Sequence, residues 1–130
     1  MPVNCLFEYA IIRVVPRVER EEFLNVGVVL FCKRPSFLQL RYQLDERRLQ
    51  TLFPGTDIEE VHQHLRAFEA IAQGTATHSP IARLDAASRF RWLTARRSTM
   101  LQCSVVHPGN CSDPAEALDR LFRQMVVIEE

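Results

Sequence analysis

Long apolar runs and a leader segment are absent from the sequence. No run approaches the roughly 20 apolar residues that a membrane-spanning helix needs. Residues 1–4 also lack the basic and apolar regions of a secretory signal peptide. We therefore expect a cytoplasmic protein that does not contact a membrane.

An excess of charge of either sign is also absent. The 16 basic and 16 acidic residues give a formal net charge of zero, so the chain as a whole has no electrostatic attraction to nucleic acid or to anionic lipid. A composition of 47% hydrophobic and 25% charged residues is typical of a globular protein and excludes disorder. Because two domains in 130 residues would each be too small for a stable core, we expect one domain over residues 1–130.

The common catalytic and metal-binding motifs are missing as well. The sequence contains no Gly-x-Ser-x-Gly, phosphate loop, His-Glu-x-x-His or Gly-x-Gly-x-x-Gly motif, so the familiar hydrolases, metalloproteases and dinucleotide-binding folds have no support. It has four cysteines but no Cys-x-x-Cys pair. The closest approach to a metal site is Cys103, His107 and Cys111, which straddle the turn-forming Pro108-Gly109 and have no fourth ligand nearby. We therefore expect thiols rather than disulfides, no metal and no cofactor.

The first third of the chain has the patterning of strands. Residues 9–15 are apolar and β-branched, with Arg13 as the single charge, and residues 26–31 form a continuous apolar run. Gly27 inside that run indicates a bulge or a close approach of another backbone. Residues 38–44 alternate between apolar and polar positions and follow a turn signal, which predicts a hairpin with the preceding strand.

The remaining chain has the patterning of helices interrupted by one strand. Thr56 and Glu59 form a capping box that starts a helix ending at Gly74, and a shorter helix can precede it. Residues 79–93 fit either one helix or two short turns. Residues 101–106 alternate like a strand that Pro108-Gly109 would end, and Asp113 caps a final amphipathic helix.

The predicted order is therefore β-β-β-α-α-β-α. Consecutive strands with short connections pair antiparallel, and amphipathic helices need a sheet face to cover. The sequence predicts an α+β fold with a small antiparallel sheet of about four strands and helices mainly on one face.

Two parts of the chain resemble a known family. The segments are residues 8–16 and 19–31 in the first third, and Phe90-Arg91-Trp92-Leu93-Thr94, His107-Pro108-Gly109 and Asp113-Pro114 further on. This combination is similar to the bacterial domain-of-unknown-function 3037 family. The resemblance implies a small bacterial protein, often encoded beside a kinase related to the HipA toxins. It implies no catalytic residues.

Arginines cluster in one stretch of the neutral chain. Residues 83–97 contain one acid, Asp85, and five arginines: Arg83, Arg89, Arg91, Arg96 and Arg97. Phe90 and Trp92 lie between them, an arrangement that suits phosphate groups, nucleic acid or an acidic protein surface. The alternative is that acid-rich helices pair with these arginines inside the molecule.

Two further sets of polar residues are candidates for binding. Glu22 and Asn25 precede an apolar strand and would lie at one end of the sheet, where they could contact a ligand or simply form a turn. Ser104 and His107 lie near Arg97 in the predicted order, and a histidine there could act as a general base or complete a turn.

Two hypotheses about function follow from these residues. The first is a binding or regulatory module that contacts an acidic partner, the HipA-like kinase being the candidate, through Arg89, Arg91, Arg96 and Arg97. The second is a small enzyme or nucleotide-binding protein that uses Arg97, Ser104 and His107 at a sheet edge. An active site requires these three groups in one concave pocket, whereas an interaction surface can be flat.

Overall fold

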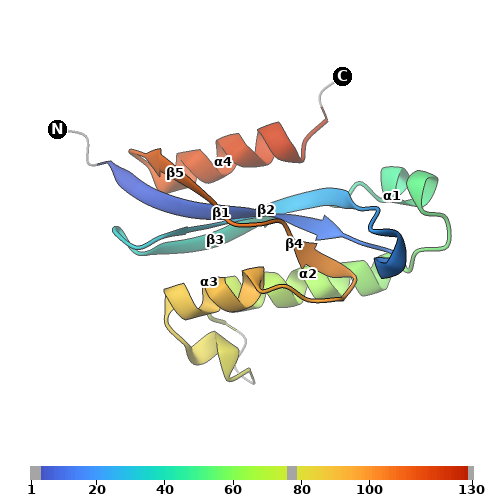
Figure 1. The fold of residues 1–130 in the computed structure, drawn as a ribbon, viewed down its shortest axis with the longest axis horizontal. Coiled ribbons are helices and arrows are strands. Elements are labelled where there is room, and N and C mark those ends of the chain that lie inside the picture. Colours follow the sequence, from blue (N-terminus) through green and yellow to red (C-terminus); the bar gives the residue numbers. More distant parts are fainter. Residues whose placement is uncertain (1–3, 76–78, 129–130) are drawn as a thin grey trace.

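The computed structural model describes residues 4–75 and 79–128, and it is an α+β fold in three layers (Figure 1). The strands are β1 (Cys5–Val14), β2 (Leu24–Cys32), β3 (Phe37–Tyr42), β4 (Leu101–Cys103) and β5 (His107–Cys111). The helices are α1 (Glu46–Leu52), α2 (Ile58–Gln73), α3 (Ala86–Thr94) and α4 (Pro114–Met125). Two 3-10 helices are η1 (Val18–Arg20) and η2 (Ile81–Arg83).

The sheet is antiparallel with the order β3-β2-β1-β4, and β5 also pairs with β1. Strand β4 pairs with the end of β1, and β5 pairs with its beginning, so the two short strands share one edge. The chain leaves that edge between them, where the Ser104 hydroxyl accepts a hydrogen bond from the backbone N–H of Ile11 at 2.8 Å. This side chain replaces a missing backbone acceptor, which explains why Ser104 is buried.

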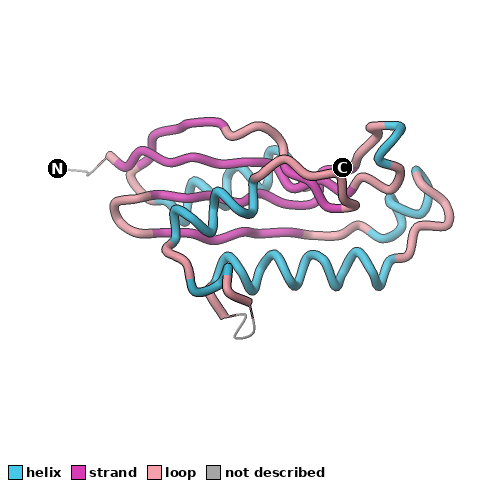
Figure 2. The backbone as a smooth tube through the Cα atoms, turned by 60° about the horizontal axis from the view of Figure 1, so that its bottom comes forward, coloured by secondary structure: helices cyan, strands magenta, loops and turns pink. Residues whose placement is uncertain are grey.

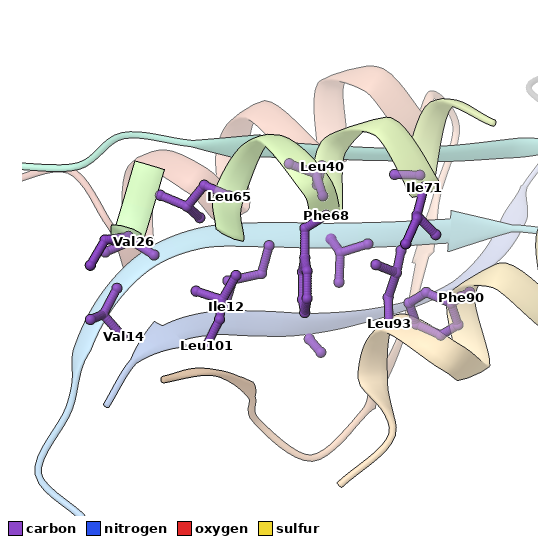
Figure 3. Close-up of a cluster of buried hydrophobic side chains, with 14 of the residues drawn as sticks. Ile12, Val14, Val26, Leu40, Leu65, Phe68, Ile71, Phe90, Leu93 and Leu101 are labelled. Atoms are coloured by element: carbon purple, nitrogen blue, oxygen red, sulfur yellow. The ribbon is translucent and has the colours of Figure 1, made fainter. Parts of the chain in front are cut away.

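Two hydrophobic clusters fill the spaces between the layers. One face of the sheet packs against α1, α2 and α3, and Ile12, Leu65 and Phe90 are fully buried in this cluster (Figure 3). The other face packs against α4 through Phe7, Leu30 and other apolar residues. Figure 2 shows the helices on both sides of the strands. The expectation that helices lie mainly on one face is confirmed, because α1, α2 and α3 all cover one face. Helix α4 covers the other face and forms the third layer.

Gly27 in β2 has the role that the sequence predicted. The β1–β2 register shifts between Ile12 and Arg13, so β2 contains a bulge beside Gly27. A Cβ atom on Gly27 would lie 2.8 Å from the backbone oxygen of Arg41 and 2.9 Å from the Cβ of Tyr42. Only glycine fits this close approach of two strands.

The helix ends confirm most of the predicted signals. Gly74 ends α2 in the left-handed conformation, and Asp113 caps α4, with Pro114 in its first turn. The capping box at Thr56 was wrong by one residue, because Asp57 accepts the hydrogen bond from the backbone N–H of Glu60 at 3.2 Å.

The prediction that Pro108-Gly109 ends a strand was wrong, because both residues lie inside β5. An edge strand tolerates proline, since the missing N–H can face away from the sheet. The ring of Phe7 covers Gly109, where any side chain would collide with it. The sequence alone therefore indicates a turn at Pro108 and Gly109, but both residues lie in an edge strand.

The stretch over residues 79–93 forms neither a single helix nor two turns. It contains η2 followed by α3, and the Asp85 side chain caps α3 by accepting a hydrogen bond from the backbone N–H of Ser88 at 2.8 Å. Phe90 and Leu93 on α3 are buried in the larger cluster. Helix α3 therefore fixes the start of the loop that leads through residues 95–100 to β4.

Candidate functional site

A hollow of about 780 Å³ lies at the edge of the sheet beside β4. We call it the β4-edge pocket. Its lining comes from β1, from the segment between β1 and β2, from the end of α3 with the loop that follows it, and from β4 with the residues after it. The lining residues are Arg13, Val15, Val18, Glu21, Phe23, Thr94, Ala95, Arg96, Arg97, Ser98, Gln102, Cys103, Ser104 and Val105.

Arg13 is a partly buried cation in this pocket. It lies on β1 between Asn25 of β2 and Gln102 of β4, and its guanidinium is 4.0 Å from the centre of the Phe23 ring. Its Nε atom is buried and has no hydrogen-bond partner within the described part of the chain. A buried N–H donor without an acceptor costs about 1–3 kcal/mol. Arg13 therefore brings a positive charge and an unsatisfied, enclosed donor to the β4-edge pocket.

Arg96 and Arg97 reach the pocket from the loop after α3. Arg97 donates a hydrogen bond to the backbone oxygen of Trp92, and its guanidinium is 4.3 Å from the centre of the Trp92 ring. The same guanidinium is 5.6 Å from the centre of the Phe68 ring. These contacts hold Arg97 in place, whereas Arg96 is exposed.

The charge of the pocket is positive. Arg13, Arg96 and Arg97 line it together with one acid, Glu21, so it has an excess of two positive charges at neutral pH. Glu21 lies in the left-handed conformation at the end of η1, with φ of 57°. The pocket therefore suits an anionic group in a chain of zero net charge.

The groups that could perform chemistry in the pocket are occupied or inert. The Ser104 hydroxyl accepts from the backbone N–H of Ile11 and donates to the backbone oxygen of Val105 at 2.9 Å. Burial raises the pKa of Cys103 to about 12, although Arg97 and Arg13 act in the opposite direction. Neither residue is an activated nucleophile at neutral pH.

The structure separates the three residues of the predicted enzyme site. Arg97 and Ser104 line the β4-edge pocket, but His107 does not. His107 lies on β5 opposite Tyr9, and the centroids of the two rings are 5.3 Å apart. The general base of that hypothesis is therefore outside the pocket.

Two of the predicted surface arginines have structural roles. Arg89 donates hydrogen bonds to the backbone oxygens of Ile71 and Ala72 at the end of α2, at 3.1 and 2.7 Å. Arg91 forms a bidentate pair with Glu8 at 2.9 and 2.7 Å, and the hydrogen bond to Glu8 raises the pKa of Arg91. Both arginines therefore have partners inside the molecule, but acidic side chains of the acid-rich helices are not those partners, since Arg89 binds backbone oxygens and Arg91 binds Glu8 of β1. Arg96 and Arg97 line the pocket.

Glu22 and Asn25 lie apart from each other. Glu22 pairs with Arg20 and lines a second hollow of about 570 Å³, which also contains Arg17 and Asp57. The Asn25 side-chain amide donates to the backbone oxygen of Met125 at 3.3 Å and so ties β2 to the end of α4. Asn25 therefore has a structural contact, and the two residues do not form one site.

The sequence contained a signal for the residue that the predictions missed. Arg13 is the single charge in an otherwise apolar strand, and a lone charge on a buried strand needs a partner or a ligand. Phe23, which covers its guanidinium, is 44% exposed. Trp92 is partly buried and packs against Arg97 and Phe68, so those two side chains occupy part of its ring surface.

Over residues 4–75 and 79–128, no group of three histidine, cysteine or acidic side chains could hold a metal ion. In the same residues, no helix is long and apolar enough to cross a membrane.

Comparison with known proteins places the chain in one family. No curated protein and no solved structure matches it. The family described as "Protein of unknown function (DUF3037)" matches residues 9–126, nearly the whole chain. The protein belongs to the DUF3037 family.

Proposed function

We propose that this protein is a non-catalytic binding module whose β4-edge pocket takes an anionic group, a phosphate or a carboxylate, of a protein partner. The observation that carries the proposal is the buried Nε atom of Arg13, which has no acceptor among the described residues. Because this atom is enclosed, the guanidinium would have to turn toward the pocket, where a ligand oxygen could accept from it and remove the cost of the unsatisfied donor. Arg96 and Arg97 would supply the remaining charge.

The rim of the pocket supports a protein as the source of that anion. Three apolar side chains on the rim are exposed: Val18 by 38%, Phe23 by 44% and Val105 by 73%. A free inorganic anion would leave these apolar groups in water. A partner that carries both an acidic group and apolar side chains would cover them and gain from their burial.

A regulatory role beside a bacterial HipA-like kinase is part of the proposal. Its support is the resemblance described from the sequence, which implies that such a kinase is often encoded nearby, together with the positive pocket. The kinase would present an acidic or phosphorylated segment to Arg13, Arg96 and Arg97. An enzyme has less support, because Ser104 is engaged in two hydrogen bonds and the Cys103 thiol stays protonated.

Reversing two charges tests the pocket. The change is Arg96→Glu with Arg97→Glu, and binding of the HipA-like kinase from the same genome is measured by surface plasmon resonance at low salt. Charge-assisted hydrogen bonds contribute about 1.5–3 kcal/mol each, so losing two predicts at least about 100-fold weaker binding.

The matched control reverses Arg47 and Arg120 to glutamate. Both are exposed, lie outside the pocket and give the same change in net charge. The control should bind nearly as the unchanged protein does. Equal loss in both double variants would show a nonspecific charge effect and reject the pocket. If the unchanged protein does not bind the kinase, the proposed partner is rejected.

A further inference from the structure

Three of the four cysteines gather at one end of the sheet, in the cluster covered by α4. Cys5 of β1 is directly opposite Cys111 of β5. Cys32 lies on β2, and its thiol donates to the backbone oxygen of Leu6 at 3.3 Å, beside Cys5. The neighbouring Cys5 thiol raises the pKa of both the Cys32 and the Cys111 thiols. Cys5 therefore lies close to the other two cysteines of this cluster.

The three thiols differ in their access to solvent. Cys5 is 3% exposed and Cys32 is 0% exposed, whereas Cys111 is partly exposed. A reagent in solution therefore meets Cys111 first, with Cys5 directly opposite it on the neighbouring strand. Cys103 belongs to the other face of the sheet and packs against the cluster of α2 and α3.

We propose that Cys111 and Cys5 form a modification site at which a hydroperoxide produces a disulfide bond. Cys111 attacks the peroxide, the O–O bond breaks, and Cys111 becomes a sulfenic acid while an alcohol or water leaves. The Cys5 sulfur then attacks the sulfenic sulfur, and the hydroxyl leaves as water with the Cys5 proton. Two electrons pass from the two sulfurs to the peroxide in total.

The sheet brings the two residues to the separation that a disulfide needs. Directly opposite residues of antiparallel strands have Cα atoms about 4.5–5.5 Å apart, and disulfides span about 4.4–6.8 Å. The register therefore places the two residues within the range of Cα separations that a disulfide bond spans. It would tie the end of β5, two residues before the Asp113 cap of α4, to the first strand.

The reaction is expected to be slow at neutral pH. Burial raises the pKa of Cys111 most, and the neighbouring Cys5 and Cys32 thiols raise it further. Since the thiolate is the species that attacks a peroxide, the rate should rise with pH, by about tenfold per unit while the pH stays below the pKa. The site therefore responds to sustained rather than brief exposure.

The test treats the unchanged protein with hydrogen peroxide. Thiols are then counted in denaturant, and peptides are mapped by mass spectrometry without reduction. We expect the count to fall from four to two, with Cys5 and Cys111 in one linked peptide pair. Formation of this pair should be faster at higher pH.

Two variants separate the roles of the sulfurs. Cys103→Ser is the matched control and should form the same linked pair at an unchanged rate. Cys5→Ser should leave Cys111 as a sulfenic acid that dimedone labels. A sulfinic acid at Cys111 without a linked pair in the unchanged protein would overturn the proposal. A Cys5–Cys32 pair, or oxidation of Cys103 before Cys111, would overturn it as well.

Discussion

Replacing Phe90 by alanine is expected to lower the free energy of unfolding by about 3–5 kcal/mol. Phe90 is 0% exposed, and its ring stacks on that of Phe31 with the centroids 5.4 Å apart. Removing it leaves a cavity between α3 and the sheet that the surrounding residues can fill only in part. Chemical denaturation followed by circular dichroism measures the change.

The control for this substitution is Leu52→Ala on α1. Leu52 is 53% exposed, so its truncation should change stability by no more than about 0.5 kcal/mol. Because α3 leads into the loop with Arg96 and Arg97, Phe90→Ala should also loosen the β4-edge pocket. Equal costs for the two variants would mean that Phe90 does not anchor α3.

Gly27→Ala is the second substitution with a large expected effect. The new methyl group would lie 2.8 Å from the backbone oxygen of Arg41 and 2.9 Å from the Cβ of Tyr42. Both atoms are held by the sheet, so the strands must separate, and overpacking of this kind costs about 1–3 kcal/mol. In a domain of this size we expect the melting temperature to fall by roughly 4 °C for each kcal/mol.

An exposed position on the neighbouring strand is the control for Gly27. Gln39→Ala on β3 removes a solvated side chain without adding atoms to the bulge. It should leave the melting temperature nearly unchanged, since exposed substitutions cost within about 0.5 kcal/mol. A melting temperature of Gly27→Ala equal to that of Gln39→Ala would show that the bulge can widen without cost.

The fold was largely predictable because most local signals agree with the packing. Each of these signals depends only on residues within one element. They are the period-two alternation in β3, the apolar run in β2 and the caps of α2 and α4. Strand β5 was not predictable, because Pro108 and Gly109 favour turns locally. Their place in a strand depends on the Phe7 ring and on an edge position, which are properties of the assembled sheet.

The site was predictable only in part. The arginine-rich stretch indicated Arg96 and Arg97. The sequence did not show that these two line the pocket while Arg89 and Arg91 bind other parts of the chain. Arg89 binds backbone oxygens of α2, and this role depends on how α2 and α3 meet. Arg13 joins the pocket from a strand more than 80 positions away along the sequence, a proximity that only the sheet order provides.

The most direct test of an anion-binding pocket at the β4 edge is an NMR titration with inorganic phosphate that follows the Nε–H resonance of Arg13. Its predicted acceptor is an anionic oxygen, since no described residue provides one. We predict a saturable shift of this resonance that disappears in the Arg96→Glu, Arg97→Glu variant. An Arg13 resonance that stays fixed while exposed arginines such as Arg47 and Arg120 respond would contradict an anion-binding pocket at the β4 edge.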